Sequence, residues 1–171
     1  MDAIVVDAAG CGAQLKMYGH LLQDDPVWRE RAALFSSKVR DITEYLASLG
    51  DGGPLGRLAL RVTYQSPCHL AHAQRITQQP RALLRRIEGL QLIEMAEPEV
   101  CCGSAGSYNV QQPEFADALL ARKVDAIVAT GADAVVSANP GCMLQIQSGL
   151  AERGRDLPVL HVVEILDRAM A

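Results

Sequence analysis

Short aliphatic runs with the character of β-strands alternate with helical stretches along this chain. Three such runs cover residues 58–64, 90–95 and 133–138, and each gives way to Gly, Pro or Ser. Continuous hydrophobic strands are typical of parallel sheets that are covered on both faces. The alternation therefore predicts an α/β fold with a mostly parallel sheet, helices on both faces and right-handed crossovers.

The expected order of elements follows from hydrophobic spacing and from the Pro and Gly residues that begin and end helices. The expected strands are 3–6, 58–64, 90–95, 133–138 and 158–161, and the expected helices are 13–22, 26–49, a short helix after Cys68, 80–88, 113–129, 142–152 and a terminal helix. Residues 51–57 (DGGPLGR) are the clear linker.

Composition limits the class of protein. The chain has 171 residues, of which 49% are hydrophobic and only 4% aromatic, so one α/β domain with an aliphatic core is expected. The net charge is −4 and the basic residues are scattered, which argues against nucleic-acid binding. No apolar run approaches the roughly 18–20 residues of a transmembrane segment, and the start lacks a basic signal region. Five cysteines without secretory signals predict reduced thiols in the cytoplasm.

Four cysteines occur where strand-like runs end. Cys101 and Cys102 are adjacent and precede Gly103, while Cys68 and Cys142 lie in the turns after two other strands. The carboxyl ends of parallel strands share one edge of a sheet, and ligands of open α/β sheets bind there. Four converging thiolates indicate a soft metal ion or an iron–sulfur cluster.

The residues around these cysteines suit metal binding. Cys68 and Cys142 each stand where a helix is expected to start, and a helix dipole lowers the pKa of a thiol there. Thiolate is the form that binds metal. Gly103, Ser104 and Gly106 let the chain bend round a bulky group and supply amide donors to sulfur.

Several other interpretations remain open. A free cysteine often fills space in a core, and a Cys101–Cys102 disulfide is possible though strained. The doublet could also act as a metal-free redox dithiol. His72 is expected only to cap or cover a helix, whereas the role of His69 is open. The common ferredoxin spacing is absent, so any cluster is of a less usual type.

An internal repeat bears on the remaining cysteine. Residues 2–11 (DAIVVDAAGC) and 133–142 (DAVVSANPGC) align without gaps. We interpret residues 1–11 as the tail strand of a preceding module and 12–171 as one complete module. Cys11 would then belong to another site, and the chain would be a piece of a longer polypeptide.

Four segments resemble the cysteine-rich CCG domain that occurs in heterodisulfide reductases and in the iron–sulfur subunits of flavin-linked dehydrogenases. The greatest likeness is to glycolate oxidase iron–sulfur subunits. The segments are AAGCGAQLKMYGH (8–20), VTYQSPCHLAHAQ (62–74), EPEVCCGSAGSYN (97–109) and ANPGCMLQIQSG (138–149). The resemblance implies electron transfer from a flavin-containing subunit that oxidises a 2-hydroxy acid, with a ferredoxin-like part preceding two such modules.

The chain departs from the family pattern in two places. Gln65-Ser66-Pro67-Cys68 stands where His-Asp-Pro-Cys is common, and Asn139 replaces the first cysteine of a Cys-x-x-Cys pair. Five thiolates become four, which suits a plain [4Fe–4S] cluster or a Cys₄ zinc site.

We therefore predict an electron-transfer domain of a glycolate/2-hydroxy-acid dehydrogenase, cytoplasmic, with any membrane association through partner subunits. Its cluster would be held by Cys68, Cys101, Cys102 and Cys142. The alternative is a zinc-stapled structural or docking module. No residue is expected to be catalytic, and the isolated chain is expected to be inactive, because no flavin or dinucleotide fingerprint and no substrate-holding His–Arg pair is present.

Overall fold

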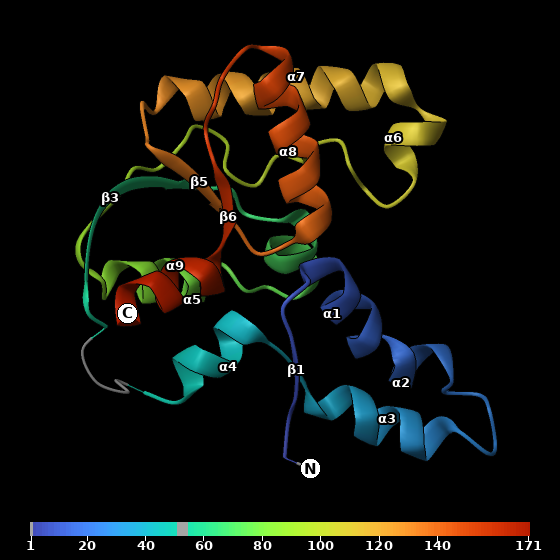
Figure 1. Ribbon diagram of the computed structural model, residues 1–171. Helices are drawn as coiled ribbons and strands as arrows, with labels where there is room; N and C mark the ends of the chain where they lie inside the picture. Colours follow the sequence, from blue (N-terminus) through green and yellow to red (C-terminus); the bar gives the residue numbers. More distant parts are fainter. Residues whose placement is uncertain (1, 51–54) are drawn as a thin grey trace.

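The computed structural model describes residues 2–50 and 55–171, so the predicted linker at 51–57 lies partly outside the described residues. Strands and helices alternate in this part of the chain, as predicted (Figure 1). The strands are β1 (Ile4–Val6), β2 (Val39–Asp41), β3 (Arg57–Tyr64), β4 (Glu88–Leu92), β5 (Ala134–Ser137) and β6 (Val159–His161). The helices are α1 (Ala9–Lys16), α2 (Tyr18–Leu21), α3 (Arg29–Lys38), α4 (Ile42–Ser48), the π-helical turn η1 (His69–Ala73), α5 (Gln79–Arg85), α6 (Tyr108–Gln111), α7 (Pro113–Ala129), α8 (Pro140–Glu152) and α9 (Val162–Met170).

The larger sheet has four strands in the order β4-β3-β5-β6, and all of its pairs are parallel. Val62 of β3 pairs with Leu92 of β4 on one side and with Ala134 of β5 on the other. Parallel neighbours point their carboxyl ends the same way. The loops after β3 and β5 therefore leave the sheet at one edge.

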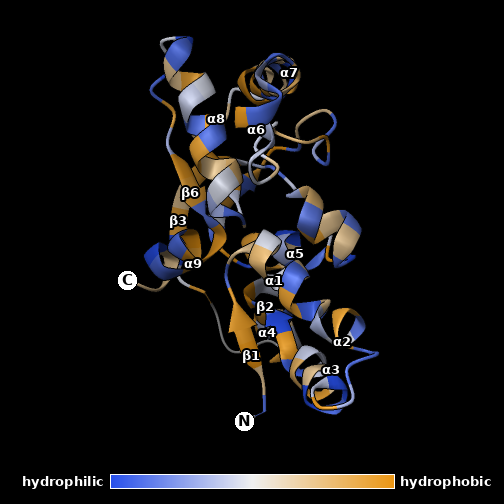
Figure 2. Cartoon of the chain, turned by 90° about the vertical axis from the view of Figure 1, so that its right-hand side faces the viewer, coloured by the Kyte–Doolittle hydropathy of each residue, from blue (hydrophilic) through white to orange (hydrophobic). Residues whose placement is uncertain are grey.

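Helices cover both faces of this sheet, which confirms the predicted fold class. Along β5, Val136 packs into a core with residues of α5 and α9, whereas its neighbour Val135 packs into a second core with residues of α7 and α8. Successive side chains of a strand point to opposite faces, so one strand serves both cores. In Figure 2 the hydrophobic colour is gathered on the strands.

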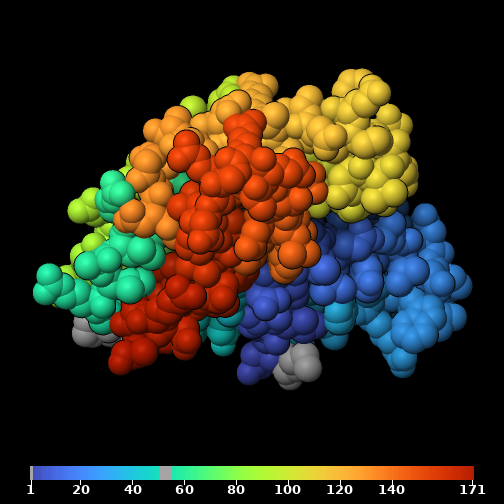
Figure 3. All heavy atoms as spheres, turned by 45° about the horizontal axis from the view of Figure 1, so that its top comes forward, coloured from blue at the N-terminus to red at the C-terminus, as the bar shows by residue number. Residues whose placement is uncertain are grey.

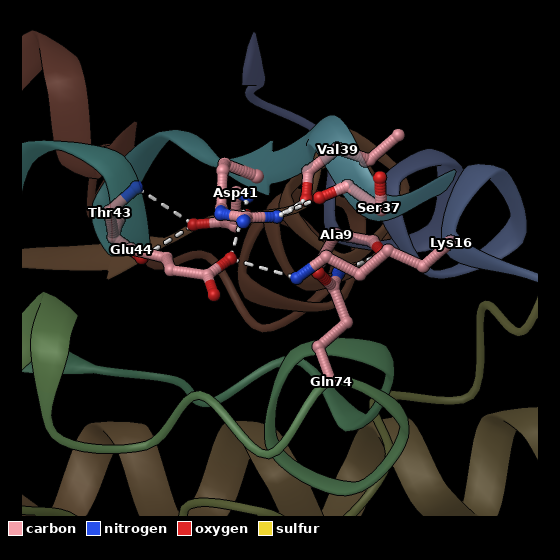
Figure 4. A network of polar contacts seen from close by, with 9 residues as sticks. Ala9, Lys16, Ser37, Val39, Asp41, Thr43, Glu44 and Gln74 are labelled. Atoms are coloured by element: carbon pink, nitrogen blue, oxygen red, sulfur yellow. Dashed lines mark hydrogen bonds and ion pairs between the residues drawn. The ribbon is translucent and has the colours of Figure 1, made fainter. Parts of the chain in front are cut away.

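The predicted helix 26–49 is wrong in its middle. Strand β2 separates α3 from α4, and Val39 pairs in parallel with Ile4 of β1. The carboxylate of Asp41 accepts from the Thr43 amide, and Glu44 accepts from the Asp41 amide, so a capping box starts a new helix (Figure 4). The helical spacing of apolar residues continues through the three-residue strand and hides it.

The predicted helix 13–22 also starts too late, since α1 begins at Ala9. Helix α1 is fastened to the larger sheet at its first turn. The amide of Ala9 donates to the carbonyl of Ala138 at 3.1 Å, and the side chain of Gln74 donates to the carbonyl of Ala9 at 2.9 Å. The blue N-terminal segment consequently lies against the orange segment of α8 in Figure 3.

In the ranges 2–50 and 55–171, the structure contains no helix with the length and apolar character of a membrane span.

Candidate metal centre

The four predicted cysteines are brought together by the loops that follow β3, β4 and β5. Cys68 is the residue before the π-helical turn η1, and Cys142 is in the first turn of α8. Cys101 and Cys102 lie in the irregular segment between β4 and α6. The hydrogen bond from the Gln74 amide to the His69 carbonyl, at 3.2 Å, closes the π turn just after Cys68. Single π turns are frequent at functional sites.

The four thiols are neighbours in a row. Cys68 and Cys101 affect each other's pKa, as do Cys101 and Cys102, and Cys102 and Cys142. Cys102 and Cys142 are buried, with 1% and 5% of their surfaces exposed, whereas Cys68 and Cys101 are partly exposed. The row therefore runs from the protein interior to its surface.

The pKa values along the row alternate in direction. Hydrogen bonds to Cys101 and burial raise the pKa of Cys68 and that of Cys102. Hydrogen bonds from Cys102 lower the pKa of Cys101 and that of Cys142. Metal binds the thiolate form, so a metal that binds all four cysteines must displace the protons that they hold.

Gly103 gives the cysteine doublet its shape. Its φ is +91°, and a Cβ at this position would lie 2.4 Å from the carbonyl oxygen of Ala116 in α7. Only glycine combines this left-handed conformation with so close an approach of two backbones. The Gly103 amide also points to the Cys101 sulfur, at 3.4 Å. The third residue of the Cys-Cys-Gly motif is therefore required by packing as well as by conformation.

The row of thiols borders a cavity of about 610 Å³. All four predicted cysteines line it, together with His69 and the loop residues Ser104 to Gly106. The ring Nδ1 of His69 lies 3.6 Å from the Cys68 sulfur. His72 is exposed and does not belong to the residues that line this cavity.

A single metal ion and an iron–sulfur cluster place different demands on four thiolates. Zinc in a Cys₄ site needs four sulfurs round one point at about 2.3 Å. Within the described part of the chain, no three Cys, His, Asp or Glu side chains are arranged to hold one metal ion. A Cys₄ iron–sulfur cluster instead takes its thiolates on different iron atoms, spread round a larger volume. A row of thiols beside a cavity fits that requirement.

Asn139 occupies the position where a cysteine is common in the resembling proteins. Its amide nitrogen donates to the Cys142 sulfur at 3.2 Å, and its amide oxygen accepts from the Gly10 amide at 3.1 Å. Hydrogen bonds of this kind orient a ligand and tune a metal site. Asn139 therefore supports a thiol and fastens α1 at the same time.

The other departure from the family pattern, at Gln65 and Ser66, lies in the core. Gln65 and Ser66 are buried. The hydroxyl of Ser137 donates to the side chain of Gln65 at 2.8 Å, and the guanidinium of Arg81 donates to Ser66 at 3.1 Å. These polar groups hold the turn that leads to Cys68.

Two residues near the site are not predicted by the sequence pattern. Cys11 is expected at another site, but the structure places it, exposed, at the wall of the same cavity. The buried Lys123 of α7 donates to two carbonyls that precede the cysteine doublet. The internal repeat, which aligns Cys11 with Cys142, is the sequence signal that could have placed Cys11 near a site. Nothing in the local pattern of α7 indicates that Lys123 is buried.

Residues 62–147 match the family of CCG cysteine-rich domains. The match includes all four cysteines of the row, and the chain belongs to this family. Similar proteins occur in several bacteria. The chain is 42% identical over 172 residues to the probable glycolate oxidase iron-sulfur subunit of Bacillus subtilis, covering 97% of the chain and 38% of that relative.

Shorter relatives match as well. Lactate utilization protein A of Exiguobacterium sp. is 30% identical over 99% of the chain and 69% of the relative. Lactate utilization protein A of Shouchella clausii is 32% identical over 97% of the chain and 70% of the relative. The chain thus spans less than half of the B. subtilis relative and about two thirds of the other two.

Proposed function

We propose that this chain is the electron-transfer domain of an iron–sulfur subunit, with a cluster held by Cys68, Cys101, Cys102 and Cys142. The observation that carries the proposal is that these four cysteines line one cavity at the ends of three strands. The family and the B. subtilis relative, which is named an iron–sulfur subunit, support it. We propose a [4Fe–4S] cluster, because four thiolates complete the ligand set of that type.

A bound cluster would accept and release electrons singly, and the surrounding residues would set its environment. The amide of Gly103 and the side chain of Asn139 direct hydrogen bonds at sulfur. Such bonds and restricted access of water are the means by which a protein sets a cluster's potential. Cys102 and Cys142 are on the buried side, so a redox partner would approach over Cys68 and Cys101.

The rest of the assembly belongs to the proposal too. We propose that electrons come from a flavin-containing subunit acting on glycolate or another 2-hydroxy acid, and that a ferredoxin-like part precedes this region in the complete protein. Residues 12–171 would form one complete CCG module, with 1–11 as the tail of a preceding one. The proposed location is the cytoplasm, with any membrane association through the partners.

Spectroscopy of protein purified without oxygen tests the cluster. The expected result is a broad visible absorption, an electron paramagnetic resonance signal on reduction and about four iron atoms per chain, as the proposed cluster requires. Zinc is silent in both spectra. Stoichiometric zinc without iron would replace this proposal by a zinc-stapled module, and a reversible two-electron titration without metal would replace it by a dithiol.

A turnover assay tests whether the catalytic groups lie on another subunit. Oxidation of a 2-hydroxy acid needs a hydride acceptor and a positioned base, which we assign to another polypeptide. The isolated chain, given glycolate and an artificial electron acceptor, should show no turnover above the buffer background. Turnover that scales with the concentration of the chain would show that it is itself catalytic.

A further inference from the structure

A lysine is buried against the segment that leads into the cysteine doublet. Lys123 of α7 is only 1% exposed. Its ammonium donates to the carbonyl of Glu97 at 2.8 Å and to that of Pro98 at 3.1 Å. Removal of an ammonium group from water is costly unless it is hydrogen-bonded. A buried cation in this place calls for a physical reason.

The lysine binds a carbonyl oxygen that also connects the two cysteine loops. The carbonyl oxygen of Pro98 accepts from Lys123 and also from the amide of Ser66, at 3.1 Å. Ser66 lies two residues before Cys68, and Pro98 lies three residues before Cys101. Lys123 therefore holds the point at which the loop after β3 and the loop after β4 are joined.

The charge of the ammonium also reaches the thiols. Burial lowers the pKa of Lys123, while Cys102, Cys101 and Cys142 act in the opposite direction and raise it. The ammonium is held by the backbone three and four residues before Cys101, so a buried positive charge lies close to the doublet, where solvent screens charges weakly.

We propose that Lys123 is a positioning residue that joins the two cysteine loops and raises the reduction potential of the cluster. Reduction adds an electron, and a nearby buried positive charge stabilises the more negative, reduced state. Net charge and hydrogen bonding are established determinants of cluster potentials. The effect on potential rests on the proposed function, whereas the joining of the loops does not.

The test compares Lys123→Met with Arg122→Met. Methionine keeps an unbranched chain of similar length but removes the charge and the donors. Arg122 is the neighbouring residue on α7 and forms an exposed ion pair with Glu97, so its replacement removes an equal charge from the protein surface beside the same loop. Exposed ion pairs of this kind contribute little to the free energy of unfolding.

The first measurement is a potentiometric titration followed by electron paramagnetic resonance, on variants with measured iron content. The midpoint potential of Lys123→Met should shift to a more negative value at equal iron content, and that of Arg122→Met should stay at the wild-type value. A Lys123→Met protein with full iron content and the wild-type midpoint would overturn the proposal.

Hydrogen exchange of the proteins as purified supplies a measurement that needs no cluster. Peptides that cover 65–69 and 97–103 should exchange faster in Lys123→Met than in the wild type and in Arg122→Met. Unchanged exchange in Lys123→Met would overturn the proposal even if its iron is lost. A wild-type chain without iron would instead refute the proposed function, and exchange would still decide whether Lys123 joins the loops.

Discussion

The first and last strand pairs of this protein are built alike but lie in different surroundings. Strands β1 and β2 pair in parallel with Ile4 opposite Val39, and strands β5 and β6 do so with Val135 opposite Val159. The shift that aligns residues 2–11 with 133–142 places Ile4 on Val135, so the pairings share one register. The likeness therefore extends beyond the two Gly-Cys segments.

The helices that follow these strands are also alike. Helix α4 is capped by Asp41 with Glu44, and α9 is capped by His161 with Glu164, both in a capping box. Helices α1 and α8 each follow an extended residue, Ala8 in one and Asn139 in the other. The N-terminal pair nevertheless forms a separate two-stranded sheet, whereas β5 lies inside the four-stranded one.

The comparison teaches that local sequence determines the strand–turn–helix unit and that its neighbours determine its burial. Val5 and Val136 hold equivalent positions, yet 42% of Val5 is exposed and none of Val136 is. Cys11 and Cys142 are equivalent too, and the first is exposed while the second is buried. Equivalent substitutions should therefore have unequal effects.

The largest expected difference concerns the cysteines. Cys142→Ser should abolish iron binding, as should Ser at Cys68, Cys101 or Cys102, because each removes one ligand of four. Cys11→Ser should leave iron binding nearly intact, although Cys11 borders the same cavity. The number of iron atoms per chain, measured on proteins purified without oxygen, tests this difference between the variants. Full iron content in Cys142→Ser would rule out the four-thiolate site, and iron loss in Cys11→Ser would add a fifth thiol to it.

The two valines give the next largest difference. Val136→Ala should lower the free energy of unfolding by about 1.5–3 kcal/mol, because it removes buried methyl groups from the core. Val5→Ala should change it by less than about 0.5 kcal/mol, as at other exposed positions. Urea unfolding of both variants measures the contrast. Equal losses would mean that burial does not distinguish the two strand pairs.

The replacement of Asn139 by Ala makes the second segment resemble the first at its helix cap. The variant loses the hydrogen bonds to Gly10 and Cys142, and should be less stable by about 1 kcal/mol. Asn139→Asp keeps the acceptor for the Gly10 amide, but it loses the donor to sulfur and places a carboxylate beside Cys142. Its unfolding free energy should also be lower than that of the wild type, and a wild-type value would contradict the role of the donor to sulfur.

The smallest effect concerns Asp41, the cap in the N-terminal pair. Burial raises its pKa above 3.8, against the opposing effects of Thr43, Lys16 and His161. The folded state then binds the proton more tightly than the unfolded state, so the contribution of Asp41 to stability falls as pH rises from the unfolded pKa through the folded one. Asp41→Asn should gain stability relative to wild type as the pH rises through this interval, as judged by urea unfolding. A difference that is constant over this range would contradict the raised pKa.

The sequence predicts the larger sheet and the gathering of four cysteines at one cavity, because strand ends and cysteines are local features. The strand–turn arrangement at Cys68 and at Cys142 is as predicted. The sequence pattern does not reveal strand β2, because three residues are too few to disturb the helical spacing of apolar residues on either side. The capping pair Asp41 and Glu44 does indicate that a new helix starts where β2 ends.

The remaining features depend on tertiary packing. The approach of Gly103 to Ala116, the burial of Lys123 and the place of Cys11 all follow from contacts between distant segments. Helix α7 has the polar positions of an amphipathic helix, and one of them faces the cysteine loops because the sheet directs those loops there. No local pattern contains that information.

The parallel topology has a kinetic consequence for the metal centre. The loops that carry Cys68 and Cys142 follow strands β3 and β5, which are bridged by the Gln65–Ser137 hydrogen bond across 72 residues. Contacts so distant in sequence form slowly, because the entropy of closing the loop is lost before they stabilise the chain. The cavity therefore comes into existence late in folding, and delivery of iron is expected to follow the closure of the sheet.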